Sequence, residues 1–214
     1  MNDEELLQHA LKLSERAGTL KERLLHWDFG PIMQMKYDTR ASNYLFSHED
    51  VPFHWDGAFH QEPAKLLFYC VESSGTGGET LFTNTELLWD SLSAAERAEC
   101  QAVRLRYQTE KKAHYGGEIN VPLVQHHPVT KRVILRLAEE VETHLNPVKL
   151  EVTGVSDPQG FYQTMREKLY HTDFLVEHQW RTGDLLVCDN FTFLHGRRPL
   201  GQNLGRSFKR VQIL

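Results

Sequence analysis

Hydrophobic residues recur at three- and four-residue steps near the start of the chain, which is the spacing of one face of an α-helix. Between Asp3 and His26 these positions hold Leu or Ala, and Glu, Lys and Arg fill most of the positions between them. Gly18 interrupts the pattern, and a glycine inside a helical pattern weakens the helix. The pattern therefore predicts a helical region over residues 3–26 that Gly18 divides into two helices.

Beyond this region, short apolar runs rich in β-forming residues are separated by turn signals, which is typical of strands. These runs predict strands at residues 66–71, 80–83, 103–108, 132–137, 184–189 and 208–213. Gly75, Gly77 and Gly78 mark a turn between the first two runs. Residues 29–53 contain Gly30-Pro31 and polar clusters, so loops and short strands are expected there.

Two further helical segments carry recognisable start signals. Residues 86–102 are predicted to be helical in two parts, because Ser93 and Glu96 have the spacing of a capping box at the start of the second part. Asp157 followed by Pro158 provides an N-cap and a first-turn proline, which predicts a helix that continues to about Tyr170.

The predicted strands are short and numerous, and the helices are few and peripheral. A doubly wound parallel sheet requires strands and helices to alternate regularly, and this chain lacks both that alternation and a GxGxxG or P-loop motif. The pattern instead predicts a mainly β fold with peripheral helices, as a sandwich or a barrel. Because no repeat or linker is present, residues 1–214 are expected to form a single domain.

Composition and charge exclude several classes of protein. Of the 214 residues, 40% are hydrophobic and 25% are charged, as in soluble globular proteins. No apolar run approaches the ~20 residues that cross a bilayer, and the acidic residues 1–5 do not resemble a signal peptide. The net charge of −5 argues against a nucleic-acid partner. We therefore expect a cytoplasmic protein that binds neither membranes nor nucleic acid.

Cysteine and histidine counts direct attention to metal chemistry of a particular kind. Cys70, Cys100 and Cys188 are widely spaced and form no CxxC pair, so neither a zinc ribbon nor a disulfide framework is indicated. Three unpaired cysteines suit a reduced cytoplasm. The 12 histidines are an unusually large number for this length, and they justify a search for metal ligands.

His54 and Asp56 are two residues apart, so in an extended segment the imidazole and the carboxylate point the same way. Far downstream, His195 follows the predicted strand at residues 184–189. Two histidines and one carboxylate form the facial triad of non-haem Fe(II) oxygenases, which leaves metal positions open. The pair at 54 and 56 alone is a weak signal because such pairs occur by chance, and the same ligand set also suits a zinc hydrolase.

The surrounding segments resemble, in order, those of the taurine dioxygenase-like (TauD/TfdA) family of Fe(II)/2-oxoglutarate-dependent oxygenases. The resemblance extends from about Tyr44 to the C-terminus. The matching segments are FHWDG at 53–57, GGET at 77–80, LWDSLS at 88–93, HPVT at 127–130, WRTGDL at 180–185, and Asp189-Asn190 followed by His195-Gly196-Arg197. This resemblance implies a double-stranded β-helix, or jelly roll, with the metal ligands at its mouth.

The same resemblance implies that His54, Asp56 and His195 are the catalytic iron ligands, with 2-oxoglutarate as the cosubstrate and dioxygen as the oxidant. Halogenases of this superfamily have a small residue in place of the carboxylate, so that chloride can bind the iron. Asp56 therefore argues for hydroxylation or desaturation.

Three further residues receive roles by their positions in the family pattern. Thr80 stands where the family places a hydroxyl on the distal carboxylate of 2-oxoglutarate. Arg206, 11 residues after His195, matches the arginine that pairs with the same carboxylate, which a guanidinium can hold through two parallel bonds. Arg210 corresponds to an arginine that in some members holds an anionic group of the substrate. On a strand, Arg206 and Arg210 face one side; without His195 upstream they would suggest a surface pair.

Within the family, one branch is most similar. Segments NYLF at 43–46, PFHWDGAFHQ at 52–61 and GGETLF at 77–82 resemble the isonitrile-biosynthesis branch, the PvcB-like oxygenases of the paerucumarin type. Those enzymes oxidise the side chain of an isonitrile made from tyrosine or tryptophan in secondary metabolism. The substrate expected here is therefore a small, anionic, amino-acid-derived molecule.

Three alternatives stay open at this point. The chain could hydroxylate another small carboxylate or a sulfonate, as in taurine-like catabolism, or be a non-catalytic jelly-roll binding protein. A zinc hydrolase is the third, but a hydrolase needs no 2-oxoglutarate anchor at Arg206. Only 53 residues precede His54, fewer than is usual for the family, so a shortened N-terminal helical region is expected. Assembly into a homo-oligomer is left open. Among the remaining histidines, His60 is expected to border the pocket.

Overall fold

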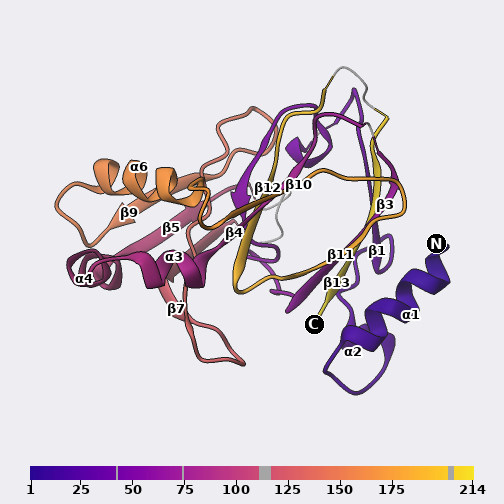
Figure 1. Ribbon diagram of the computed structural model, residues 1–214, viewed down its shortest axis with the longest axis horizontal. Coiled ribbons are helices and arrows are strands. Elements are labelled where there is room, and N and C mark those ends of the chain that lie inside the picture. The colour runs from indigo at the N-terminus through magenta and orange to yellow at the C-terminus, as the bar shows by residue number, and fades with distance from the viewer. Residues whose placement is uncertain (42, 74, 111–116, 202–204) are drawn as a thin grey trace.

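Two four-stranded antiparallel sheets face each other in the computed structural model, which describes residues 1–41, 43–73, 75–110, 117–201 and 205–214 (Figure 1). The first sheet contains, in spatial order, β1 (Ile32–Lys36), β13 (Ser207–Ile213), β3 (Lys65–Glu72) and β11 (Leu185–Asp189). The second contains β10 (Leu175–His178), β4 (Thr80–Asn84), β12 (Phe193–Arg197) and β2 (Val51–His54). The mainly β, jelly-roll prediction is confirmed.

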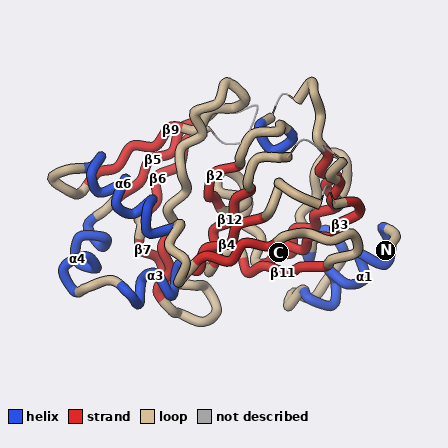
Figure 2. Tube along the Cα trace, turned by 45° about the horizontal axis from the view of Figure 1, so that its top comes forward, coloured by secondary structure: helices blue, strands red, loops and turns tan. Residues whose placement is uncertain are grey.

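A third sheet and three helices cover the outer face of the second sheet (Figure 2). The third sheet contains β6 (Glu118–Pro122), β5 (Arg104–Gln108) and β9 (Lys149–Thr153), and a separate hairpin contains β7 (Val124–His126) and β8 (Val133–Leu135). The helices are α3 (Thr85–Ser91), α4 (Ala94–Ala102) and α6 (Pro158–Leu169). Leu81 and Leu194 of the second sheet share one apolar core with Leu105 and Phe161. The second sheet is therefore buried on both faces, and β4 is apolar or small-polar along its buried length.

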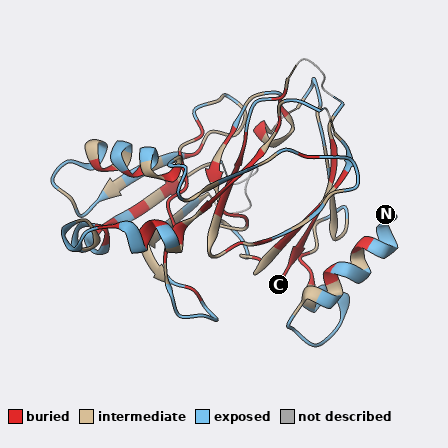
Figure 3. Cartoon of the chain, viewed as in Figure 1, coloured by how far each residue is buried: buried red, intermediate tan, exposed pale blue. Residues whose placement is uncertain are grey.

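The first sheet is covered on its outside by the N-terminal helices α1 (Asp3–Leu13) and α2 (Leu20–Arg23), with Gly18 between them as predicted. Leu6 and Ala10 of α1 pack on Val211 and Ile213 of β13. Because side chains alternate along a strand, Phe208, Arg210 and Gln212 of β13 point to the opposite face, into the barrel. Figure 3 shows buried positions both along the strands and on one side of the helices, whose other sides are exposed.

Local signals in the sequence account for most of these elements. Ser93 and Glu96 form the predicted capping box, and the side chain of Asp157 accepts a hydrogen bond from the N–H of Gly160 at the start of α6. The sequence did not predict β6, β7, β9, β10 or β12, because several of these are short or only half-buried and lack a continuous apolar run. In the described part of the chain, no helix is both long and apolar enough to cross a membrane.

Candidate functional site

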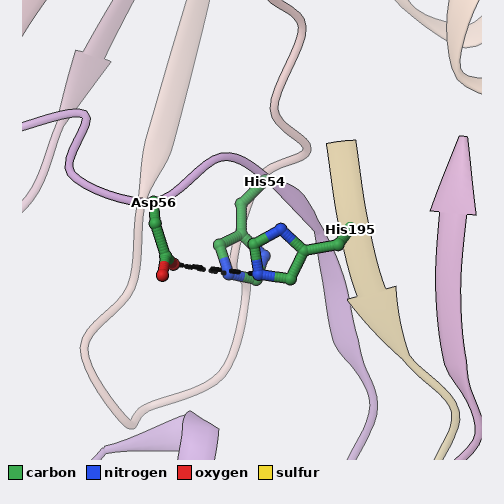
Figure 4. Close-up of side chains that lie close together, drawn as sticks. All are labelled: His54, Asp56 and His195. Carbon is green, nitrogen blue, oxygen red and sulfur yellow. Dashed lines mark ion pairs between the residues drawn. The ribbon is translucent and has the colours of Figure 1, made fainter. Parts of the chain in front are cut away.

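His54, Asp56 and His195 lie together inside the barrel (Figure 4). His54 ends β2 and is paired directly with His195 on the neighbouring strand β12, and their ring centroids are 4.2 Å apart. Asp56 lies in the loop after β2, with Oδ1 3.7 Å from Nε2 of His54 and 3.8 Å from Nε2 of His195. One strand pair and one loop therefore bring the three residues proposed from the sequence to a single point.

The surroundings of both imidazoles favour the neutral form, which is the one that binds a metal ion. Nδ1 of His54 is 2.9 Å from the carbonyl oxygen of Pro52, so that nitrogen carries the proton and Nε2 keeps its lone pair toward Asp56. Burial lowers the pKa of His54, and burial together with the neighbouring His54 lowers the pKa of His195 well below its ordinary value. Neutral imidazoles are the metal-binding species.

The carboxylate of Asp56 is buried and ionised. Burial by itself raises its pKa, but neighbouring groups, the charge of Arg210 first and the hydrogen bond from Gln212 among the others, outweigh that effect, and the pKa lies below its ordinary value. Nη1 of Arg210 lies 2.9 Å from Oδ2 and 3.1 Å from Oδ1, and Nε2 of Gln212 donates to Oδ2 at 2.6 Å. Two neutral imidazoles and one ionised carboxylate form a donor set that fits Fe(II) and leaves positions open.

The side chain of Asn190 forms hydrogen bonds with the backbone of Asp56. Its side-chain oxygen accepts a hydrogen bond from the Asp56 N–H at 3.0 Å, and its amide nitrogen donates to the carbonyl oxygens of Asp56 and Pro63. Asn190 is fully buried, so none of these groups has water as a substitute partner. In the sequence, Asn190 stands out only as part of a motif, and no role for its side chain was expected.

Arg136 supports the same loop, and no sequence signal indicated it. This side chain is fully buried; it donates to the carbonyl oxygen of Asn190 and to the carboxylate of Glu62, both at 2.7 Å. Its guanidinium lies 4.6 Å from the ring centroid of Trp55, whose indole N–H also donates to Glu62. The residues on both sides of Asp56 in this loop are thus fixed by groups from distant parts of the chain.

A small cavity of about 30 Å³ opens beside the histidines and is lined by Thr80, Arg206 and Arg210, among others. Oγ of Thr80 accepts a hydrogen bond from the indole N–H of Trp180 at 2.8 Å, which leaves the hydroxyl proton to be donated elsewhere. The guanidinium of Arg206 lies 3.9 Å from the ring centroid of Phe208. The structure therefore brings Thr80 and Arg206 to one cavity next to the histidines.

The guanidinium of Arg206 is buried. Burial, and next the charge of Arg197, lower the pKa of Arg206 to about 9, and it forms no ion pair with any carboxylate of the described residues. Gly78 makes room for this side chain: its φ is +75°, and a Cβ there would lie 3.0 Å from Cδ of Arg206. A buried cation of this kind is stabilised by an anion, so the cavity suits a carboxylate.

A second, large cavity of about 840 Å³ is lined by His54 and Asp56. Its lining includes the aromatic side chains Trp27, Phe29, Tyr44, Phe46, Phe59 and His60. His60 thus borders the pocket as expected. Arg210 lines both cavities. Its Nη2 meets only the weak acceptor Sδ of Met33 at 3.0 Å, and within the described structure its buried Nε has no hydrogen-bond partner.

Other basic residues in or near the predicted motifs make contacts away from the three clustered residues. Arg197 is buried and donates to the carbonyl oxygens of Ser47 and Glu49, whereas Arg198 forms an exposed pair with Glu177. His127 is buried and pairs with Asp189 at 3.0 Å, away from the three clustered residues. His114 lies outside the described residues.

The chain is similar to a family of dioxygenases and to two proteins named for isonitrile chemistry. The family model described as "Taurine catabolism dioxygenase TauD, TfdA family" matches residues 8–212. A 3-((Z)-2-isocyanoethenyl)-1H-indole synthase of Fischerella ambigua is 39% identical over 199 residues, which cover 89% of this chain and 73% of that protein. A tyrosine isonitrile desaturase of Pseudomonas aeruginosa is 32% identical over 196 residues, which cover 87% of this chain and 67% of that protein.

A solved structure is similar over nearly the whole chain. It is that of PvcB, described as an Fe, alpha-ketoglutarate dependent oxygenase from an isonitrile synthetic pathway. The two structures superimpose with a TM-score of 0.76 at 26% sequence identity, and the match covers 99% of this chain and 71% of PvcB.

Proposed function

Because the chain belongs to the taurine catabolism dioxygenase TauD, TfdA family, we propose that it is an Fe(II)/2-oxoglutarate-dependent dioxygenase that desaturates the side chain of an isonitrile derived from an aromatic amino acid. The observation that carries this proposal is the cluster of His54, Asp56 and His195 between a small cationic cavity and a large aromatic one. Two relatives add support, since one is named for an isocyanoethenyl-indole product and the other for tyrosine isonitrile.

The metal site rests on the three clustered residues. His54 and His195 would bind Fe(II) through Nε2, and Asp56 through one carboxylate oxygen, which leaves the remaining positions to exogenous ligands. Bound iron, with 2-oxoglutarate and dioxygen, supplies the oxidising power for the reaction. The residues of the chain keep both imidazoles neutral, hold the carboxylate ionised and fix the backbone of its loop through Asn190.

The cosubstrate site is the small cavity. Arg206 would pair with the distal carboxylate of 2-oxoglutarate through two parallel N–H bonds, and Thr80 would donate its hydroxyl proton to the same group. Trp180 supports this assignment, because its N–H occupies Oγ of Thr80 as an acceptor and so favours donation of the hydroxyl proton into the cavity. The anion would also neutralise a buried cation that lacks an ion-pair partner among the described residues.

The substrate site is the large cavity, and Arg210 would bind the carboxylate of the substrate there. Although Nη1 of Arg210 already contacts Asp56, its other nitrogens meet a thioether or no described acceptor, so it retains donors for a second anion. The aromatic walls favour an aromatic side chain over a small molecule such as taurine. This is why we favour the isonitrile substrate over taurine-like catabolism.

We further propose that residues 1–214 act as one oxygenase domain in a reduced cytoplasm. Cys70, Cys100 and Cys188 are all buried free thiols, which suits a reducing compartment. A net charge of −5 offers no general attraction to nucleic acid.

Two successive measurements test the proposal. Anaerobic titration of Fe(II) into the protein with 2-oxoglutarate should give the charge-transfer absorption of a chelated cosubstrate, and this absorption should be absent in His195→Ala. Under air, three candidate substrates are then compared: the isonitrile of tyrosine, the isonitrile of tryptophan, and taurine. For each, succinate release is measured, and mass spectrometry shows whether the substrate has lost two hydrogen atoms. Desaturation of an aromatic isonitrile is expected. Turnover of taurine alone, or a metal site without 2-oxoglutarate binding, would refute the proposal.

A further inference from the structure

The carboxylate of Asp56 is connected to the N-terminal segment through one amide. Nε2 of Gln212 donates to Oδ2 of Asp56 at 2.6 Å, and Nε1 of Trp27 donates to Oε1 of the same Gln212 at 2.9 Å. Gln212 is 3% exposed, so water cannot replace either partner. Trp27 comes from the segment between α2 and β1, whereas Gln212 lies near the end of β13.

The two neighbours allow only one orientation of the Gln212 amide. An indole N–H is a donor only, so it must meet the oxygen of the amide, and an ionised carboxylate is an acceptor only, so it must meet the nitrogen. The hydrogen bonds to Trp27 and to Asp56 therefore require the same orientation of the amide. A side chain held by two partners of opposite kind has little freedom to turn.

Gln212 distinguishes the two oxygens of Asp56, whereas Arg210 does not. Nη1 of Arg210 lies 2.9 Å from Oδ2 and 3.1 Å from Oδ1, so it stabilises the charge of either oxygen. The hydrogen bond from Gln212 reaches Oδ2 alone, and Oδ1 is the oxygen that lies 3.7 and 3.8 Å from the two histidine nitrogens. Gln212 thus determines which oxygen faces His54 and His195.

We propose that Gln212 is a positioning residue that presents a single oxygen of Asp56 to the metal, and that Trp27 acts through it by fixing the amide. This inference rests on the proposed function, since it concerns the metal held by Asp56. A carboxylate can offer a metal ion one oxygen or two. Holding Oδ2 by a hydrogen bond leaves Oδ1 as the ligand and keeps the neighbouring position free for exogenous ligands.

Trp27, which fixes the amide of Gln212, also belongs to the wall of the large cavity. Its ring stacks on Phe29 with centroids 6.3 Å apart, lies 6.2 Å from His60, and forms part of the wall of the large cavity. The residue that fixes the Gln212 amide is therefore itself held in place by the cavity wall. Trp27→Phe removes the indole N–H but keeps an aromatic ring in the cavity wall, so the loss of the hydrogen bond to Gln212 is tested with much of the packing retained.

The test uses Mn(II) alone as a redox-inactive probe, with its dissociation constant measured by electron paramagnetic resonance on the whole chain. Gln212→Leu should weaken Mn(II) binding by about 10-fold, the lower end of what outer partners of metal ligands contribute. Trp27→Phe should weaken it by a smaller factor. The double variant should bind no more weakly than Gln212→Leu, because Trp27 acts only through Gln212. The absorption spectrum of bound Co(II) should change in both single variants.

Matched controls separate positioning from stability. Gln163→Leu makes the Gln-to-Leu change at an exposed position of α6, and Trp89→Phe makes the Trp-to-Phe change at a buried position of α3. Both controls should leave the Mn(II) constant and the Co(II) spectrum unchanged, even where Trp89→Phe lowers the melting temperature. Unchanged Mn(II) binding in Gln212→Leu, or additive effects in the double variant, would overturn the inference. If wild type and Asp56→Ala bind Mn(II) equally, the proposed metal site itself fails.

Discussion

Arg210 and Asp56 form a buried ion pair across the barrel, with Nη1 of the arginine 2.9 Å from Oδ2 of the carboxylate. The arginine lies on β13 of the first sheet and the aspartate follows β2 of the second, so the pair joins the two sheets at the proposed metal centre. A cation that sequence resemblance associates with the substrate therefore also stabilises a proposed metal ligand.

This pair makes Asp56→Ala a test of stability as well as of metal binding. The variant should lose Mn(II) binding and, because it leaves Arg210 buried without its anion, should lose about 3–5 kcal/mol of unfolding free energy. The double variant Asp56→Ala/Arg210→Gln should be more stable than Asp56→Ala alone. Urea denaturation of the metal-free proteins measures the difference, and a double variant that is the less stable of the two would contradict the prediction.

Arg206→Gln should weaken 2-oxoglutarate binding and leave Mn(II) affinity nearly unchanged. The substitution removes the proposed bidentate pair with the distal carboxylate, a loss of roughly 2–5 kcal/mol when a buried charge loses its partner. Calorimetric titration of 2-oxoglutarate into the Mn(II)-loaded protein provides the measurement, with the exposed Arg198→Gln as control. Equal 2-oxoglutarate affinity in Arg206→Gln and wild type would mean that another cation anchors the cosubstrate.

Arg210→Gln should raise the Michaelis constant for the isonitrile substrate and uncouple succinate formation from product formation. Affinity for 2-oxoglutarate should hardly change, since we propose that Arg206 makes that contact. The discriminating comparison is between the free acid of the substrate and its methyl ester in the wild-type enzyme. If the neutral ester is turned over as well as the free acid, Arg210 does not bind a substrate carboxylate.

Asn190→Ala should destabilise the protein and weaken Mn(II) binding together. It leaves the N–H of Asp56 and two carbonyl oxygens without their partner, and each such buried group costs about 1–3 kcal/mol. The backbone of Asp56 then loses its fixed position relative to the histidines. Urea denaturation and Mn(II) titration on the same preparation check both effects; a loss of stability with unchanged Mn(II) affinity would limit Asn190 to a structural role.

Glu96 gives a prediction for acid stability away from the proposed metal site. Hydrogen bonds from Ser93, then contact with Lys168, lower the pKa of Glu96 to about 2. A carboxyl with a depressed pKa contributes stability above its unfolded value, near 4.5, and loses that contribution as the pH falls toward 2. Because Glu96 is largely exposed, we expect Glu96→Gln to lower the unfolding free energy at pH 7 by only a few tenths of a kcal/mol. This difference should vanish near pH 2, and Glu99→Gln on the same helix should show neither effect.

The sequence predicted those features that depend on neighbouring residues. The capping box at Ser93, the break at Gly18 and the shared direction of His54 and Asp56 all follow from spacings of a few residues. Strand β12, which carries His195, was missed because residues 193–197 have no alternating pattern and are buried by both neighbouring layers.

The supports of the site could not be predicted, because their partners are far away in the chain. Trp27 and Gln212 are 185 residues apart, and Asp56 and Asn190 are 134 apart. Arg136 looks like any surface arginine until the fold brings Glu62 and Trp55 against it. No local pattern records such pairings, which arise only when the two sheets close on each other.

Strand β13 has a consequence for the order of events during protein synthesis. It lies between β1 and β3, pairs with both, and carries Arg210 and Gln212 toward Asp56. Until residues 207–213 have left the ribosome, β1 and β3 each present an open edge, and open edges invite association with other chains. The proposed metal site can therefore be completed only after this strand has been translated, because Arg210 and Gln212 reach Asp56 from it.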